Sequence, residues 1–207
     1  MARRVVRDRP QAVGERTKQA IVQAALRALK EIGFSRASGR AIARLGGFNQ
    51  ALIFYHFGSV NGLLLAALDQ TSAARMDRYR HALVGVRSLD ELIEVARQTY
   101  REDLEEGHMT VVAEMIAGSV ADPKLRPEIA SRIRLWVEFV EDVLNPFLQG
   151  SPLGILVSRR DAANALVAFY LGLNISSRLD DDQRWVENLF DAAERASPLL
   201  APFLTGG

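Results

Sequence analysis

The chain has 207 residues, of which 48% are hydrophobic and 25% charged, as in an ordinary globular protein. It contains no cysteine, which excludes disulfides, thiolate metal sites and cysteine nucleophiles. No apolar run approaches the roughly 20 residues that cross a bilayer. The arginines at the N-terminus are not followed by the apolar stretch of a secretion signal. We therefore expect a cytoplasmic protein without a membrane partner.

Apolar residues recur at spacings of three and four along most of the chain, and no strand alternation is evident, so the sequence predicts an all-α fold. In the first helix one apolar stripe is formed by Ile21, Ala24, Ala25, Ala28, Leu29 and Ile32. A loop is expected at 149–158 and a break at Ser197-Pro198. The expected helices cover 17–32, 38–46, 50–57, 59–83, 89–106, 109–121, 124–148, 160–178 and 183–196.

Charge is unevenly distributed along the chain. Residues 1–65 hold 11 Lys and Arg against 3 Asp and Glu, a net charge of +8, whereas residues 66–207 hold 15 against 22, a net charge of −7. A small basic part joined to a larger acidic part favours a polyanion partner for the first and self-association or small-molecule binding for the second. Uneven solvation of the surface is the alternative explanation.

Segment 38–57 has the layout of a helix-turn-helix. The Ser38 hydroxyl can cap the first short helix, which Gly46-Gly47 ends. Asn49 can cap the second, a helix of only two turns in which Ile53, Phe54 and Phe57 are expected to pack inward. The N-terminal residues of such a second helix can reach base edges in a major groove.

Three stretches carry a more specific resemblance: "TKQAIVQAALRALKEIGF", "SGRAIARLGGFNQALIFYHFGS" and "LLLAALD". In order and spacing they resemble the N-terminal domain of TetR-family transcriptional regulators over about residues 17–65. The resemblance implies a basic arm at 1–15, a helix-turn-helix domain at 16–65 and a helical ligand-binding and dimerisation domain at 66–207. It further implies a homodimer that binds a double-stranded DNA operator, represses transcription and is released by a small-molecule effector, with no enzymatic activity and no cofactor.

The resemblance also assigns roles to residues of the basic part. Amide groups can pair with adenine or guanine edges, and a leucine can touch a thymine methyl. A surface cap and core filler are the alternative roles of these side chains. The expected base-reading residues are Asn49, Gln50, Ala51, Leu52 and Tyr55.

Phosphate contacts are expected from the start of the first short helix, from the second short helix and from the N-terminal arm. The arm also contains Arg7 and Arg9 and can enter a minor groove, or it is a disordered tail. The expected phosphate-binding residues are Ser38, Arg40, His56, Arg3 and Arg4.

Three residues depart from the family pattern. Val60 stands where most members carry a lysine that binds the DNA backbone, Gln50 replaces a frequent lysine, and Leu52 replaces a frequent threonine or serine. These departures favour an alternative function, that of a small-molecule-binding or scaffold protein whose degenerate helix-turn-helix no longer reads DNA.

The resemblance places the dimer interface on the last two long helices. Small side chains in the first of them would let a second helix approach closely; an intramolecular core is the alternative. The expected interface residues are Ala162, Ala165, Phe169, Gly172, Ser176, Trp185, Leu189 and Phe190.

A ligand pocket is expected among aromatic and polar residues of the acidic part. Glu114 is the most informative, because a carboxylate among apolar residues is costly unless it is paired or exposed. Core packing is the alternative for the aromatic residues and methionines. The candidates are Tyr100, Met109, Glu114, Met115, Trp136, Phe139, Phe169, Tyr170 and Asn174.

The sequence gives little support to catalysis. It lacks the Gly-x-Ser-x-Gly elbow, the phosphate-binding Gly-x-x-x-x-Gly-Lys, the dinucleotide fingerprint and His-Glu-x-x-His. The scattered histidines His56, His81 and His108 do not form a metal site by spacing. An all-α enzyme that uses the pocket catalytically is a second alternative function.

Overall fold

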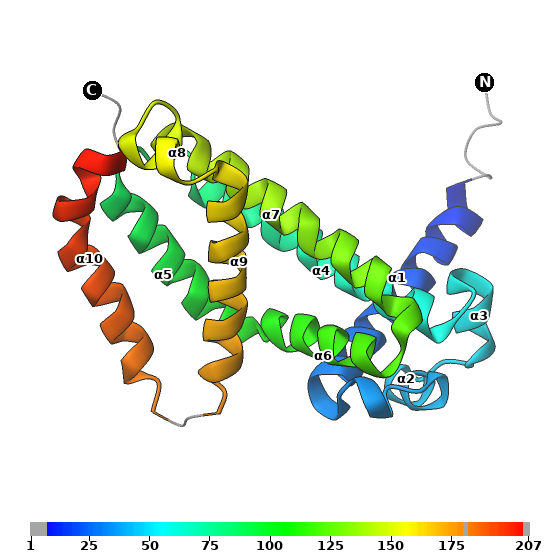
Figure 1. Ribbon diagram of the computed structural model, residues 1–207. Coiled ribbons are helices and arrows are strands. Elements are labelled where there is room, and N and C mark those ends of the chain that lie inside the picture. Colours follow the sequence, from blue (N-terminus) through cyan, green and yellow to red (C-terminus); the bar gives the residue numbers. More distant parts are fainter. Residues whose placement is uncertain (1–7, 180–181, 205–207) are drawn as a thin grey trace, which may run out of the picture. The chain divides into compact units, whose positions relative to one another are not determined.

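The computed structural model describes residues 8–179 and 182–204, and within these ranges every regular element is helical (Figure 1). The predicted all-α fold is confirmed. Short 3₁₀ turns lie at Phe34–Arg36 and Pro123–Leu125. The α-helices are α1 (Asp8–Ile32), α2 (Gly39–Gly46), α3 (Ala51–Phe57), α4 (Val60–Ala82), α5 (Leu89–Glu106), α6 (His108–Ala121), α7 (Arg126–Leu148), α8 (Pro152–Leu156), α9 (Arg159–Ser176) and α10 (Arg184–Leu204).

Two segments are helical although the sequence did not predict a helix there. α1 begins at Asp8, so the second half of the segment expected to be an arm is helical. The expected loop at 149–158 contains α8, whose start is set by Ser151: its hydroxyl accepts a hydrogen bond from Gly154 N at 3.1 Å. Pro152 follows at the first helical position, where a proline costs no hydrogen bond.

The predicted break at Ser197-Pro198 is wrong. α10 continues through Pro198 and Pro202 to Leu204, although each proline removes a backbone donor and crowds the preceding turn. Tertiary packing offsets that cost, because Ser197 is buried and Leu204 packs against buried residues of α7 and α9.

The chain forms two compact units. The N-terminal unit consists of the chain up to Ser72 together with 110–129, and the C-terminal unit consists of 73–109 and 130–207. The first therefore includes more than the expected interval 16–65. Two hydrogen bonds explain this: Phe34 N donates to the Glu114 carboxylate at 2.7 Å, and Asn61 Nδ2 donates to Asp122 at 2.7 Å.

In the N-terminal unit the predicted apolar stripe of α1 is buried from Ile21 to Leu29, and its last member, Ile32, is half-buried. α1 packs against α2, and Ile42 of α2 and Ile53 of α3 are fully buried. Burying such a large aliphatic side chain stabilises a fold by about 1.5–3 kcal/mol. This packing fixes which face of α2 and α3 is turned to the solvent.

In the C-terminal unit a buried ion pair joins Arg75 of α4 to Asp103 of α5. Tyr170 of α9 donates to Asp103 Oδ2 at 2.6 Å, and Arg75 also pairs with Glu106 at 2.7 Å. Burial raises the pKa of Tyr170, which therefore remains a neutral phenol that donates to the carboxylate. Polar contacts thus tie three helices together inside the unit.

A second group of ion pairs holds α10 against α5. Arg97 pairs with Glu187, Asp191 and Glu194 at 3.3, 2.9 and 3.0 Å. Arg101 donates two hydrogen bonds to Glu187, at 3.0 and 2.8 Å, which lower the pKa of that carboxyl. Below this charged layer Tyr100, Leu173 and Val186 form a small apolar core.

No single helix in the described ranges is long and apolar enough to cross a membrane. α3 and α4 meet the criterion of length and composition only as a pair, which is bent by 65° at the break between them.

We predict that Asp103→Ala strongly destabilises the C-terminal unit. The substitution leaves Arg75 buried without its main counter-charge and removes the acceptor of Tyr170. Breaking a buried pair in this way costs about 3–5 kcal/mol of unfolding free energy. Urea denaturation followed by circular dichroism measures the loss. Glu102→Ala is the control: Glu102 pairs with Arg78 at the surface, so a loss below about 1 kcal/mol is expected. Equal losses in the two variants would contradict the prediction.

Candidate nucleic-acid interface

α2 and α3 are joined by a tight turn that local chemistry specifies. Ser38 caps α2 by accepting a hydrogen bond from Ala41 N at 3.3 Å, as predicted. Gly47 ends α2 in a left-handed conformation with φ of 68°, which favours glycine. Asn49 Oδ1 then accepts a hydrogen bond from Ala51 N at 2.9 Å and so caps the first turn of α3. The predicted helix-turn-helix layout is present in the structure.

The orientation of α3 decides which of its side chains can meet a ligand. Ile53 is buried, whereas Leu52, His56 and Phe57 are half-buried. Gln50, Ala51 and Tyr55 of the predicted base-reading residues are exposed, and so is Asn49. Tyr55 is the most prominent, with 82% of its surface accessible.

The prediction that Phe54 packs inward is wrong. Half of the surface of Phe54 is exposed, on the same face as Ala51 and Tyr55. The spacing of three and four residues places these side chains together once Ile53 faces the core. The outward face of α3 is therefore aromatic, and an aromatic or methyl contact to bases is the chemistry that it can supply.

Gln50 lies against the start of α2. A Cβ atom on Gly39 would approach Gln50 Nε2 to 2.9 Å and Val60 Cγ2 to 3.2 Å. The Gln50 amide thus lies beside the N-terminus of α2, where backbone N–H groups attract anions. Val60 contributes only a methyl group at the position where the family pattern has a lysine.

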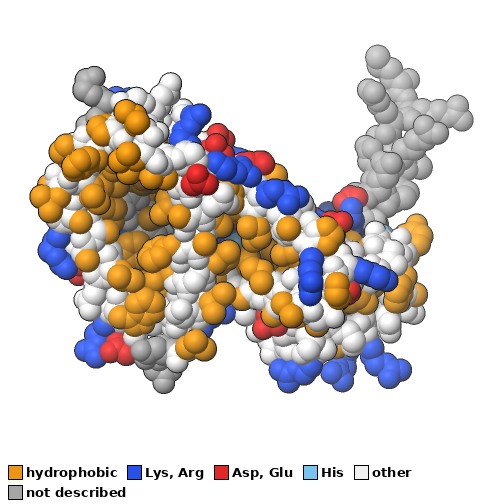
Figure 2. All heavy atoms as spheres, viewed as in Figure 1, with side chains coloured by type: hydrophobic (Ala, Val, Ile, Leu, Met, Phe, Trp, Pro, Cys, Tyr) orange, Lys and Arg blue, Asp and Glu red, His pale blue; other side chains and the backbone are white. Residues whose placement is uncertain are grey.

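The predicted phosphate-binding residues differ in what surrounds them. Ser38 and Arg40 are exposed, and Arg40 has no ion-pair partner within the part of the chain that the structure describes. His56 is half-buried, with its ring edge-on to Tyr55 at 4.8 Å between centroids. Arg3 and Arg4 lie outside the described residues. Figure 2 shows Lys and Arg side chains along the edge of the N-terminal unit where α2 lies.

The N-terminal extension of α1 lies beside α3. Gly14 and Glu15 of α1 line a shallow groove of about 450 Å³ together with Tyr55 and His56 of α3. Sequence periodicity did not reveal that this part of α1 lies next to α3.

The predicted pocket residues do not form one site. Glu114 and Met115 belong to the N-terminal unit, where Glu114 accepts the hydrogen bond from Phe34 N and has a structural role. In the C-terminal unit Tyr170 packs with Tyr100 in one cluster and accepts a hydrogen bond from Asn174 Nδ2 on its backbone oxygen at 2.9 Å.

Two further aromatic candidates are grouped elsewhere in the C-terminal unit. Trp136 contacts Phe139, Tyr79 and His108, with ring centroids 5.9, 5.8 and 6.2 Å apart. Burial raises the pKa of Tyr79 to about 12. Phe169 is 58% exposed and belongs to neither group. The described residues contain no cluster of His, Asp and Glu suited to a metal ion.

Sequence reasoning missed Arg75, Tyr79 and Asp103. In a sequence the charged Arg75 and Asp103 look like solvated side chains and Tyr79 looks like an ordinary aromatic residue, and only their tertiary partners distinguish them. The groove between α5 and the start of α10 was likewise not predicted.

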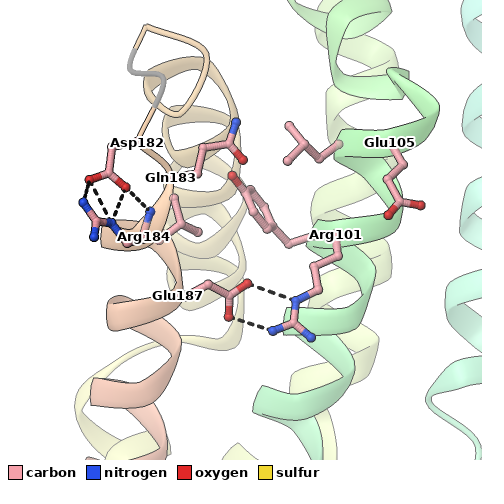
Figure 3. Close-up of a pocket in the computed structure, with 9 residues that line it drawn as sticks. Arg101, Glu105, Asp182, Gln183, Arg184 and Glu187 are labelled. Atoms are coloured by element: carbon pink, nitrogen blue, oxygen red, sulfur yellow. Dashed lines mark hydrogen bonds and ion pairs between the residues drawn. The ribbon is translucent and has the colours of Figure 1, made fainter.

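That groove has a volume of about 510 Å³ (Figure 3). The groove has an apolar floor, and charged residues lie at its margins. It is lined by Tyr100, Arg101, Leu104, Glu105, Asp182, Gln183, Arg184, Val186 and Glu187.

The predicted interface residues of α9 are mostly exposed. Those of α10 are partly exposed and partly packed against the core. Ala165, Phe169, Gly172 and Ser176 face the solvent, and Ala162 is half-buried. In α10 Leu189 is exposed, but Trp185 and Phe190 pack against the core of their own unit, as the alternative explanation proposed.

Comparison with known proteins agrees with this architecture. Residues 21–67 match the family of bacterial regulatory proteins described as the tetR family. The HTH-type transcriptional regulator UidR of Escherichia coli K12 is 25% identical over 133 residues, which are 64% of this chain and 67% of that protein.

Solved structures share the fold. The fatty acid degradation regulator FadR from Bacillus halodurans matches with a TM-score of 0.71 and 13% identity, over 86% of this chain and 96% of its own. GusR from Salmonella enterica matches with a TM-score of 0.69 and 22% identity, over 91% and 95%.

The capped α2–turn–α3 unit, with an exposed face on its second helix, defines the class of helix-turn-helix DNA-binding regulators. Residues 21–67 match the DNA-binding domain of the tetR family of bacterial regulatory proteins, as the sequence resemblance predicted, and the solved structures share the fold of the chain.

We predict that Tyr55→Ala weakens binding to the operator by roughly 5- to 150-fold, since a good contact to a base is worth about 1–3 kcal/mol. The thermal midpoint stays unchanged because the side chain is 82% exposed. Fluorescence anisotropy of a labelled duplex measures the affinity. Val84→Ala, at a 79% exposed position of the C-terminal unit, is the control and leaves it unaltered. The same affinity in both variants would show that α3 does not read DNA with this face.

Proposed function

We propose that this chain is a homodimeric repressor that a small-molecule effector releases from a roughly palindromic operator. The exposed face of α3 carries the proposal. α3 has seven residues, so one copy contacts few base pairs, and a symmetric second copy supplies the other half-site about 34 Å away.

Exposed apolar residues on α9 and α10 support the homodimer. Leu166 and Phe169 of α9 are 45 and 58% exposed, and Leu189 of α10 is 42% exposed. Large apolar surface that is left to water in one copy is typical of a surface that a partner covers. A twofold axis would bring the same helices of two copies together.

The continuity of α4 supports the response to an effector. Its first turns contribute Leu63 and Leu64 to the core of the N-terminal unit, and its last turns carry Arg75 and Tyr79 in the C-terminal unit. A molecule that binds one conformation of the C-terminal unit better than another changes the population that is competent to bind DNA. Two structural neighbours were solved as complexes, a regulator from Saccharomonospora viridis with choline and EbrR with imidazole.

Selection from a random pool of duplexes with the full chain tests the DNA-binding part of the proposal. We expect enrichment of a palindrome whose half-sites lie about one helical turn apart, with an affinity that falls steeply as salt rises. Ala51→Glu places a carboxylate on the exposed face of α3 and abolishes enrichment. Ala74→Glu, an equally small and exposed residue of α4, is the control and leaves it intact.

The missing lysine at Val60 favours one other function, a scaffold or ligand-binding protein that no longer reads DNA. A selection that enriches no common sequence would support it.

Repression is measured separately. We expect transcription from a promoter that carries the selected operator to increase when Ala51→Glu replaces the natural chain.

We predict that Phe169→Asp shifts the protein toward a monomer, because the substitution places a charge within the apolar surface that the second copy would cover. Size-exclusion chromatography with light scattering measures the mass, and we expect operator affinity to fall by at least about tenfold as the second half-site is lost. Asn164→Asp adds the same charge at another exposed position of α9 and should leave the dimer unchanged. A monomeric natural chain would contradict the proposal directly.

A further inference from the structure

The groove between α5 and α10 contains a polar atom that the protein itself does not use. Tyr100 lines the groove and is only 2% exposed, yet its hydroxyl has no hydrogen-bond partner among the described residues. Leaving a buried hydroxyl unpaired costs about 1–3 kcal/mol. A ligand that bonds to Tyr100 Oη would remove that cost.

The remainder of the groove floor is apolar. The Leu104 side chain and the buried Val186 line it beside Tyr100, and Gln183 extends from the start of α10 toward α5 (Figure 3). The floor can therefore hold a hydrocarbon body, whereas the phenol and the amide can each donate to or accept from a hydroxyl or carbonyl group. A volume of about 510 Å³ is sufficient for a small organic ligand.

Two ion pairs account for four of the charged residues that line the groove. Arg101 is held by Glu187, with bonds of 3.0 and 2.8 Å, and Arg184 is held by Asp182, with its shortest bond at 2.6 Å. In Figure 3 the Glu105 carboxylate is directed away from α10. A charged ligand would thus lose its hydration without gaining a free counter-charge inside the groove.

We propose that this groove binds a neutral, amphipathic small molecule, with its apolar part on Tyr100, Leu104 and Val186 and a hydroxyl or carbonyl group on Tyr100 Oη. The proposal rests on the proposed function in one respect: the bound molecule is the effector or a close analogue of it. A molecule bound in the groove contacts α10, and this helix also carries the exposed Leu189. The ligand would therefore act next to the surface proposed for dimerisation.

Titration of the full-length protein with 2-phenylethanol tests the groove directly and without DNA. The chain has two tryptophans, and Trp185 packs in the same cluster as Tyr100 and Val186. In a Trp136→Phe background the remaining fluorescence therefore reports on this cluster. We expect saturable binding of 2-phenylethanol, and at least about tenfold weaker binding of 2-phenylethylammonium and of phenylacetate.

Two matched variants separate a ligand contact from a structural role. Tyr100→Phe removes only the unpartnered hydroxyl, so the thermal midpoint does not fall, but the affinity for 2-phenylethanol decreases roughly three- to tenfold. Tyr79→Phe alters another buried tyrosine of the same unit that does not line the groove, and the affinity stays unchanged. Unaltered binding by Tyr100→Phe, absence of saturable binding, or equal binding of the charged analogues would each overturn the proposal.

Release of the selected operator duplex is measured separately at a saturating concentration of 2-phenylethanol. Saturable binding that depends on Tyr100 but leaves DNA bound supports the groove and contradicts its role as the effector site. Operator binding by a protein that never binds the three probes supports the DNA-binding function and overturns the groove.

Discussion

A pair of opposite charges, Arg75 and Asp103, is removed from water in the interior of the C-terminal unit, and the packing of three helices depends on that pair. Either charge would be costly if it were buried alone, because an unpaired buried ion costs several kcal/mol, which is a large part of a domain's net stability. Tyr170 satisfies the second carboxylate oxygen and, as a neutral phenol, adds no further charge. The position of α4 in this unit is therefore set by electrostatics as well as by apolar contact.

In the proposed function the same helix connects the ion pair to the DNA-binding part of the chain. α4 begins among the buried residues of the N-terminal unit and ends in the network around Arg75. Ion-pair networks have discrete arrangements and do not deform continuously, so a ligand that favours one arrangement can change the equilibrium of the whole chain. The charge pairs between α5 and α10 have a related property: they lie at the margin of the groove and hold the helix that carries part of the proposed dimer surface.

The aromatic side chains of the N-terminal and C-terminal units differ in their exposure. In α3, Phe54 and Tyr55 are exposed on the surface proposed to bind DNA, whereas Tyr79 and Tyr100 are buried and Tyr170 is half-buried in the C-terminal unit. Exposed aromatic groups beside a helix N-terminus suit a polyanion with stacked, methyl-bearing bases. Buried phenols combine an apolar ring with one polar atom, which suits a small organic ligand.

The sequence by itself determined the all-helical fold, the helix caps, the helix-turn-helix and the family, because apolar periodicity, capping oxygens and turn glycines act between residues that are close along the chain. Only the tertiary structure decided that Phe54 faces outward, that Glu114 serves the turn at Phe34, and that α10 continues past its prolines. It also decided that Arg75 and Asp103 are buried partners and that Tyr100 faces a groove. Each of these outcomes depends on a contact between distant segments, and a charged or aromatic residue looks the same in a sequence whether its partner is water or another helix.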